Sequence, residues 1–82
     1  MKITNVQAAD DYRLLIDFEE DNQVIFNMQR MVETLPYLRL QNKEVFRAVR
    51  FEDKAVYWDP PDGKPEIFPL RITVDSILFT LR

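Results

Sequence analysis

The chain has 82 residues, of which 46% are hydrophobic and 12% aromatic, and its formal net charge is −3. The length predicts a single domain over residues 1–82. The composition is too hydrophobic and too weakly charged for an intrinsically disordered chain. The sequence contains no cysteine and no histidine, which excludes disulfides, thiolate metal sites and histidine-dependent catalysis.

Alternation of apolar and polar residues predicts a β-hairpin over residues 12–28. Residues that lie opposite each other in an antiparallel pair share a face of the sheet. A three-residue loop at 20–22 keeps the apolar residues together, because it places Phe18 opposite Val24. Asn22 tolerates the left-handed conformation that the third position of such a loop requires.

The remaining pattern predicts an α+β domain built on a small, mostly antiparallel sheet. The expected strands are at 2–8, in the hairpin 12–28, and near 48–59 and 66–70, and short helices are expected near 29–35, 42–48 and 74–81. Asn42 and Thr73 are suitable N-caps for the last two helices. A turn at residues 53–54 places Phe51 opposite Val56, which again gives a consistent apolar face.

The stretch "AVYWDPPDGKPEIF" (55–68) contains the chain's one Trp and one Gly. Trp58 can close the core with its indole N–H bonded to a carbonyl, or it can anchor a ligand or partner. The turn at 53–54 places Trp58 on the same face as Val49, which favours the core. The carboxylate candidates for acid–base chemistry are Asp59, Asp62 and Glu66 in this stretch and Glu19, Glu20 and Asp21 at the hairpin tip, although charged turn residues are mostly solvated.

Few kinds of catalytic site are compatible with this composition. A single Gly excludes a glycine-rich phosphate loop, and the one Ser, Ser76, has no evident base beside it. The residues "DPPDGKPE" lack the ligand spacing of a calcium loop. We therefore expect no catalytic residues, no metal ligands and no cofactor, and hence a protein that is not an enzyme.

Lys43, Arg47 and Arg50 stand at helical spacing and would form a basic stripe on one helix. Binding along a nucleic-acid duplex generally takes about six or more phosphate contacts. In a chain of negative net charge we interpret the stripe as the solvated face of an amphipathic helix, which would also suit an acidic protein partner. Nucleic acid is accordingly not an expected partner.

The ends of the chain carry two further expectations. No basic segment followed by an apolar stretch begins the sequence, so we expect no signal peptide, no membrane contact and a cytoplasmic protein. Near the other end, in "ILFTLR", Leu78 and Phe79 must pack either on the chain's own core, which we favour, or across a dimer interface.

The order of these features resembles a bacterial family, the domain of unknown function 2442. The matching stretches are "DYRLLIDFEEDN" (11–22), "LQNKEVFRAVRFEDKAVYW" (40–58) and "VDSILF" (74–79). Two features depart from the family's pattern: Asn22 stands where Gly is usual, and the segment "DPPDGKPEIFPLRI" is longer. The resemblance implies a regulatory or protein-interaction module, in some members linked to a DNA-binding domain or to toxin–antitoxin genes, with no catalytic residues to transfer.

The leading hypothesis is a non-enzymatic interaction or regulatory module that self-associates or binds a small protein partner. The alternative is a small-ligand-binding protein or carboxylate-dependent enzyme centred on residues 58–62, and the second alternative is weak nucleic-acid binding through the basic stripe. The candidate interaction residues are Trp58, Asp59, Asp62, Lys43, Arg47, Arg50, Leu78 and Phe79.

Overall fold

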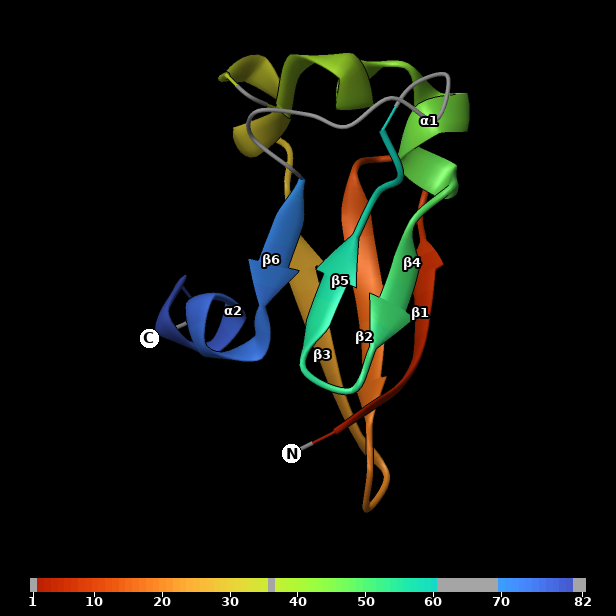
Figure 1. Cartoon of the computed structure of the whole chain (residues 1–82), viewed down its shortest axis with the longest axis vertical. Coiled ribbons are helices and arrows are strands. Elements are labelled where there is room, and N and C mark those ends of the chain that lie inside the picture. The colour runs from red at the N-terminus through yellow and green to blue at the C-terminus, as the bar shows by residue number, and fades with distance from the viewer. Residues whose placement is uncertain (1, 36, 61–69, 81–82) are drawn as a thin grey trace.

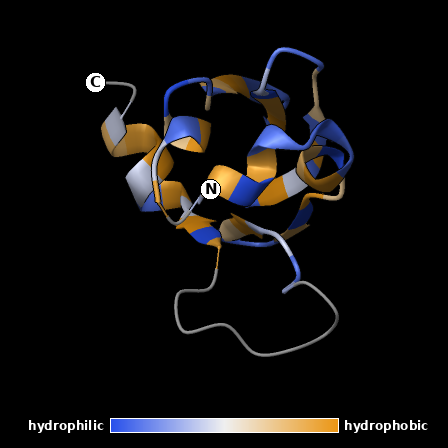
Figure 2. Cartoon of the chain, turned by 90° about the horizontal axis from the view of Figure 1, so that it is seen from above, coloured by the Kyte–Doolittle hydropathy of each residue, from blue (hydrophilic) through white to orange (hydrophobic). Residues whose placement is uncertain are grey.

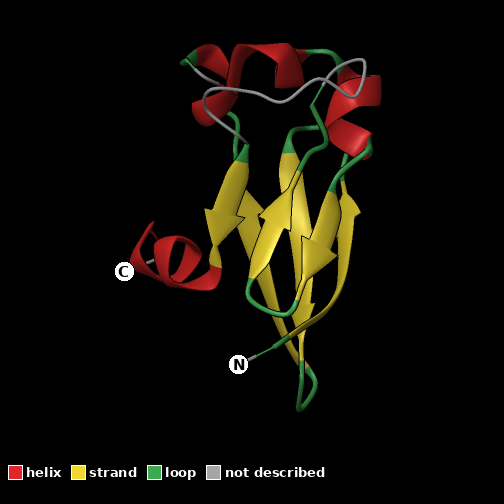
Figure 3. Cartoon of the chain, viewed as in Figure 1, coloured by secondary structure: helices red, strands yellow, loops and turns green. Residues whose placement is uncertain are grey.

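The computed structural model describes residues 2–35, 37–60 and 70–80. In this part of the chain two three-stranded antiparallel sheets combine with short helices, so the predicted α+β class is confirmed. The two sheets lie face to face with their strands along the long axis of the molecule, and short helical segments cover one end (Figures 1 and 3).

The first sheet has the order β1–β2–β3, with β1 at Ile3–Ala8, β2 at Arg13–Phe18 and β3 at Asn22–Asn27. Burial follows the alternation predicted from the sequence, because every second residue of β2 points into the core. The buried residues of β2 are Leu14, Ile16 and Phe18. The alternation rule for a half-buried strand therefore holds.

The predicted register of the hairpin is wrong by two residues. Phe18 lies opposite Asn22 rather than Val24. The loop does have three residues, but they are 19–21, and the left-handed φ angles occur at Glu20 (64°) and Asp21 (60°) rather than at Asn22. Asn22 instead enters the strand and its amide reaches back to the carbonyl oxygen of Glu19 at 3.5 Å. A shift of two residues leaves every side chain on its predicted face, so alternation alone does not reveal it.

The second sheet has the order β4–β5–β6, with β4 at Arg50–Glu52, β5 at Ala55–Tyr57 and β6 at Arg71–Thr73. The turn at 53–54 is confirmed, since Phe51 lies opposite Val56. Of the strand expected near 66–70, residues 66–69 lie outside the described residues, and the strand described in this part of the chain is β6. The prediction of one sheet also needs correction, because a sequence pattern predicts strands but not which sheet each strand joins.

The helical segments are short. They are the 3-10 turns η1 (Met31–Glu33) and η2 (Tyr37–Gln41) and the α-helices α1 (Lys43–Arg47) and α2 (Val74–Thr80). The helix expected over 29–35 is only the single turn η1. Both predicted N-caps are confirmed: the Asn42 side chain accepts from the Glu44 N–H at 3.0 Å, and the Thr73 hydroxyl accepts from the Ser76 N–H at 3.2 Å. Seen along the long axis, the helical segments over the sheets carry both hydrophobic and hydrophilic residues (Figure 2).

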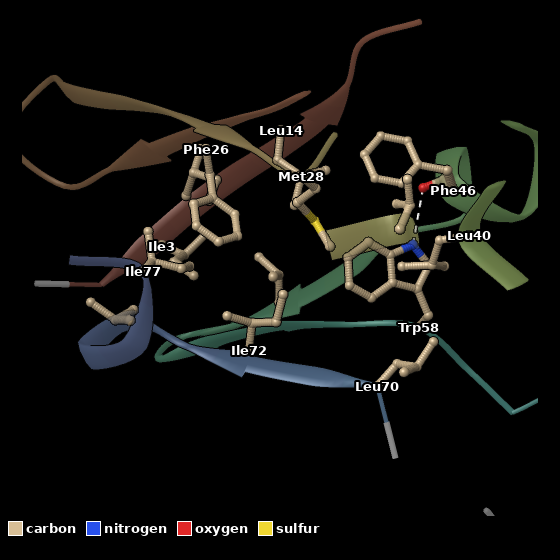
Figure 4. Packing of buried hydrophobic residues seen from close by; sticks show 14 of the residues in the cluster. Ile3, Leu14, Phe26, Met28, Leu40, Phe46, Trp58, Leu70, Ile72 and Ile77 are labelled. Carbon is tan, nitrogen blue, oxygen red and sulfur yellow. Dashed lines mark hydrogen bonds between the residues drawn. The ribbon is translucent and has the colours of Figure 1, made fainter. Parts of the chain in front are cut away.

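One hydrophobic core joins the sheets and the helices (Figure 4). Its large, fully buried side chains include Phe18, Phe26, Phe46, Leu14, Ile16, Met28, Leu40, Leu70, Ile77 and Val56. Burying each such side chain contributes about 1.5–3 kcal/mol. On one side of the molecule β1 is tied to the second sheet, because the Ile3 N–H donates to the Asp53 carbonyl oxygen at 2.9 Å. The outer strands β3 and β6 and the helix α2 lie on the opposite side (Figure 1).

Candidate functional site

Trp58 belongs to the core, as the strand pairing expected from a turn at residues 53–54 favoured. It is 3% exposed, and its indole N–H donates to the carbonyl oxygen of Phe46 at 3.0 Å. Its ring stacks on the ring of Phe46, with centroids 6.0 Å apart (Figure 4). The alternative role of Trp58 as a ligand or partner anchor is therefore wrong, because a buried and hydrogen-bonded indole has no surface to offer.

Asp59 lies on the surface beside Trp58, where two arginines contact it. Its carboxylate forms an ion pair with Arg50 at 3.1 Å, and its backbone carbonyl accepts from the Arg39 guanidinium at 2.9 Å. The hydrogen bond with Asp59 raises the pKa of Arg50. Asp59 is thus an exposed, ion-paired surface residue and not a carboxylate buried in a cleft. Asp62, its predicted companion, lies outside the described residues.

The basic residues do not form the predicted stripe. Helix α1 ends at Arg47, and Arg50 is the first residue of β4, so the three residues are not on one helix. Arg47 forms an ion pair with Asp10 at 2.7 Å, and the Lys43 ammonium lies 5.9 Å from the centre of the Tyr12 ring. The sequence spacing was misleading because the helix is only five residues long.

A hollow that the sequence did not predict lies where the turn between β1 and β2 meets the helical segments. It has a volume of about 820 Å³, and we call it the Tyr12 hollow. Its described lining residues are Asp10, Asp11, Tyr12, Gln29, Val32, Glu33, Gln41 and Lys43. The lining thus combines carboxylates, amides and one ammonium group around an aromatic ring.

Tyr12 itself has a strained backbone. Its φ is 64°, which is an outlier for a bulky aromatic residue. Three contacts hold it there: its hydroxyl donates to the Gln41 carbonyl oxygen at 2.6 Å, its own carbonyl accepts from the Met28 N–H at 2.8 Å, and its ring meets Phe46 edge-on at 5.4 Å. Strain of this kind costs roughly 1–3 kcal/mol and often marks a functional position. No sequence signal pointed to Tyr12, because nothing in the type of residue implies a positive φ.

The electrostatics of the hollow come from exposed groups. The hydrogen bond and charge of Arg47 lower the pKa of Asp10, with a smaller contribution from Lys43. Asp11 forms an ion pair with Arg13 at 3.1 Å. Within the described ranges no polar or charged side chain is buried, and no group of acidic residues there is arranged to hold a metal ion. The described surface therefore offers recognition by charge and hydrogen bonding, without a desolvated group of the kind that catalysis uses.

Several large apolar side chains remain exposed. The described ones are Ile25 (53%), Leu35 (80%), Leu38 (42%), Phe51 (37%) and Phe79 (74%). At the end of α2 the favoured packing on the chain's own core holds only in part. Ile77 is fully buried and Leu78 packs partly on the core, whereas Phe79 faces solvent. Contiguous apolar patches mark contact surfaces, whereas exposed apolar side chains that are scattered singly are common on protein surfaces.

Comparison with known proteins adds no relative, since no family model, no curated protein and no solved structure matches the chain. The resemblance to the domain of unknown function 2442 thus rests on its sequence motifs and stays a prediction. Within the described residues no helix is long and apolar enough to cross a membrane.

Proposed function

We propose that the protein is a non-enzymatic interaction module that associates with a second copy of itself or with a small protein partner. The observation that carries this proposal is the combination of exposed Phe79, Leu35 and Ile25 with a described interior that holds no polar or charged side chain. A surface of this kind gains free energy by covering apolar area. The sequence resemblance to a family of regulatory or interaction modules supports the same proposal.

The ionisable residues support a binding role rather than a catalytic one. Arg47 lowers the pKa of Asp10 and Asp59 raises the pKa of Arg50, and both ion pairs are exposed to solvent. Catalytic acids and bases typically have their pKa values shifted by burial or by a like charge in a cleft. Ion pairs of the observed kind instead fix surface geometry. Because both arginines face carboxylates, nucleic-acid binding at this surface is also disfavoured.

The proposal is tested by measuring what the protein associates with. The tagged chain is purified from its native host, and the mass of the eluted species is determined by light scattering and compared with the 9.8 kDa of one chain. We expect a defined complex, either a dimer or a complex with a partner in stoichiometric amount. A matched pair of variants, Ile25→Ser and Glu20→Ser, separates an apolar contact from a general surface effect. A chain that stays monomeric and retains no stoichiometric partner would contradict the proposal.

A second candidate, small-ligand binding, is favoured by one observation, the strained Tyr12 in a hollow of about 820 Å³. Ligand sites combine a few converging polar groups with an aromatic surface. The test is a thermal-shift screen of amines, carboxylates and nucleotides with the wild type and with Lys43→Met. Binding in the hollow predicts a compound that raises the melting temperature of the wild type and loses this effect in the variant. If no compound raises the melting temperature of the wild type, this candidate is rejected.

A further inference from the structure

Strand β3 is the outer strand of the first sheet, and among the described strands only β2 pairs with it. The Met28 N–H donates to the Tyr12 carbonyl oxygen, so the even-numbered residues of this region direct their backbone groups toward β2. The odd-numbered residues of β3 direct theirs away from it, because backbone groups alternate along an antiparallel ladder. These residues are Gln23, Ile25 and Asn27. Among the described residues, no group accepts from their backbone N–H groups. We call this row of backbone groups the β3 edge.

The β3 edge lacks the features that normally block pairing. Natural edge strands are protected by charged side chains, prolines or bulges. The segment "NQVIFN" has no charge and no proline along its six residues. The other described outer strands are different: β4 carries Arg50 and Glu52, and β6 carries Arg71, which pairs with Glu52. Strand β1 has a register irregularity near Ile3 and Asn5 and a backbone bond to the second sheet.

The residues of the β3 edge are complementary to themselves in an antiparallel arrangement. If a two-fold axis passes beside Ile25, this residue faces the partner's Ile25, and Gln23 faces the partner's Asn27. All outward N–H and C=O groups of the three residues then find a partner, which gives about six backbone hydrogen bonds. The facing side chains are Ile with Ile and amide with amide, so no like charges oppose each other. Such a two-fold contact is the usual geometry of a homodimer.

The side chains on the outer face extend this complementarity to the neighbouring strand. Half-buried Leu15 lies opposite Ile25, so the paired sheets would share a continuous row of four apolar side chains, two from each copy. Arg13 lies opposite Asn27 and Asp17 lies opposite Gln23, to which it is hydrogen-bonded at 2.7 Å. In the two-fold arrangement each row that starts at Arg13 ends at the partner's Asp17. Each row across the joined sheets thus ends in opposite charges with two amide side chains between them, and no like charges face each other at the contact.

We infer that β3 pairs with β3 of a second copy of this chain, joining the two first sheets into one continuous six-stranded sheet centred on Ile25. This inference rests on the proposed interaction function and names the partner and the surface. A single strand pair buries less area than the roughly 1,200–2,000 Å² of a stable standard interface. We therefore expect a reversible dimer with a dissociation constant of order micromolar or weaker. A contact of this kind responds to concentration.

The test is sedimentation equilibrium of the wild type and three variants at protein concentrations from roughly 1 μM to 1 mM, spanning the affinity expected for a small interface. Ile25→Lys places a charge at the two-fold axis, on a side chain that is already 53% exposed, so folding is retained. Gln23→Pro removes one outward N–H and the side-chain bond to Asp17, while the backbone bonds to β2 are kept. Phe79→Lys is the matched control, because it adds the same charge at another exposed apolar position. Circular dichroism verifies the fold of each variant.

We expect the wild type to move from 9.8 kDa toward twice this mass as its concentration rises. We expect Ile25→Lys to raise the dissociation constant at least tenfold, Gln23→Pro to raise it by a smaller factor, and Phe79→Lys to leave it unchanged. A dimer that survives Ile25→Lys but is lost in Phe79→Lys overturns the β3 pairing and leaves the interaction function standing. A wild type that is monomeric at every concentration overturns the pairing as well. The interaction function then depends on recovery of a different partner, so the two failures are distinguishable.

Discussion

At the helical end of the molecule, formed by η1, η2 and α1, side chains from distant parts of the sequence bind backbone carbonyl oxygens. The Tyr12 hydroxyl donates a hydrogen bond to the Gln41 carbonyl oxygen, and the Trp58 indole donates one to the Phe46 carbonyl oxygen. The Gln41 side-chain amide donates to the Val32 carbonyl oxygen at 3.0 Å. Along the β3 edge the described backbone N–H groups receive no such partner. Helices of three to five residues cannot satisfy their own carbonyls. The helical end therefore needs these side chains for stability, whereas the edge strand leaves its groups to water or to another chain.

The contrast predicts that substitutions at the helical end change stability and leave association alone. The largest effect is expected for Phe46→Ala, because Phe46 is 1% exposed and contacts both Tyr12 and Trp58. Urea denaturation should show a loss of about 3–5 kcal/mol in the free energy of unfolding. The matched control Phe79→Ala should change it by less than about 0.5 kcal/mol. A loss below about 1 kcal/mol for Phe46→Ala would mean that the helical end is not part of the core.

A smaller effect is expected for Trp58→Phe, which keeps an aromatic ring but removes the indole N–H. The Phe46 carbonyl then remains buried without its donor, and the smaller ring packs less completely. Together these changes should lower the free energy of unfolding by about 1–3 kcal/mol. Chemical denaturation followed by circular dichroism measures this change. An unchanged midpoint would show that the hydrogen bond contributes nothing to stability.

Loss of the α1 cap should have an effect of about 1 kcal/mol. Asn42→Ala removes the acceptor of the Glu44 N–H, and N-cap truncations cost about 0.5–2 kcal/mol. Asn42→Asp keeps a capping oxygen and serves as the control. Thermal denaturation should separate the two variants by several degrees, about 4–8 °C for each kcal/mol in a domain of this size. Equal melting temperatures would contradict the cap.

The smallest effect is a pH dependence at Asp10. Its pKa is lowered below 3.8 by the hydrogen bond and charge of Arg47, so the folded state favours the ionised form. The stabilisation is present above the unfolded pKa and is lost as the pH falls through the folded pKa. Asp10→Asn should therefore lower the melting temperature slightly at pH 7, and this difference should shrink as the pH falls through the folded pKa. The reverse trend would contradict the direction of this shift.

The features that the sequence predicted are those that depend on local pattern. The alternation around Leu14 and Ile16 predicted β2, and the side chains of Asn42 and Thr73 predicted two helix starts. The parity of the turn at 53–54 correctly placed Trp58 in the core. These predictions succeed because the period of a strand and the chemistry of a cap act over a few residues.

Features that depend on how distant segments meet could not be predicted in this way. A register shift of two residues preserves every face, so the pattern could not locate the loop at 19–21. The positive φ of Tyr12 and the hollow around it arise only when the β1–β2 turn meets η2 and α1. The uncharged segment of β3 was visible in the sequence, but its position at the edge of a sheet was not.

Amide hydrogen exchange tests the open edge and its pairing most directly. Within β3, Val24 directs its N–H toward Ile16 of β2, whereas Ile25 directs its N–H outward. At low concentration the Ile25 amide should exchange far faster than the Val24 amide. At high concentration the pairing predicts that the Ile25 amide becomes protected from exchange in the wild type. The Phe79→Lys variant should still dimerise, so its Ile25 amide should be protected to the same extent. A rate of exchange at Ile25 that is fast and independent of concentration in the wild type would contradict the proposed pairing of β3 with a second copy.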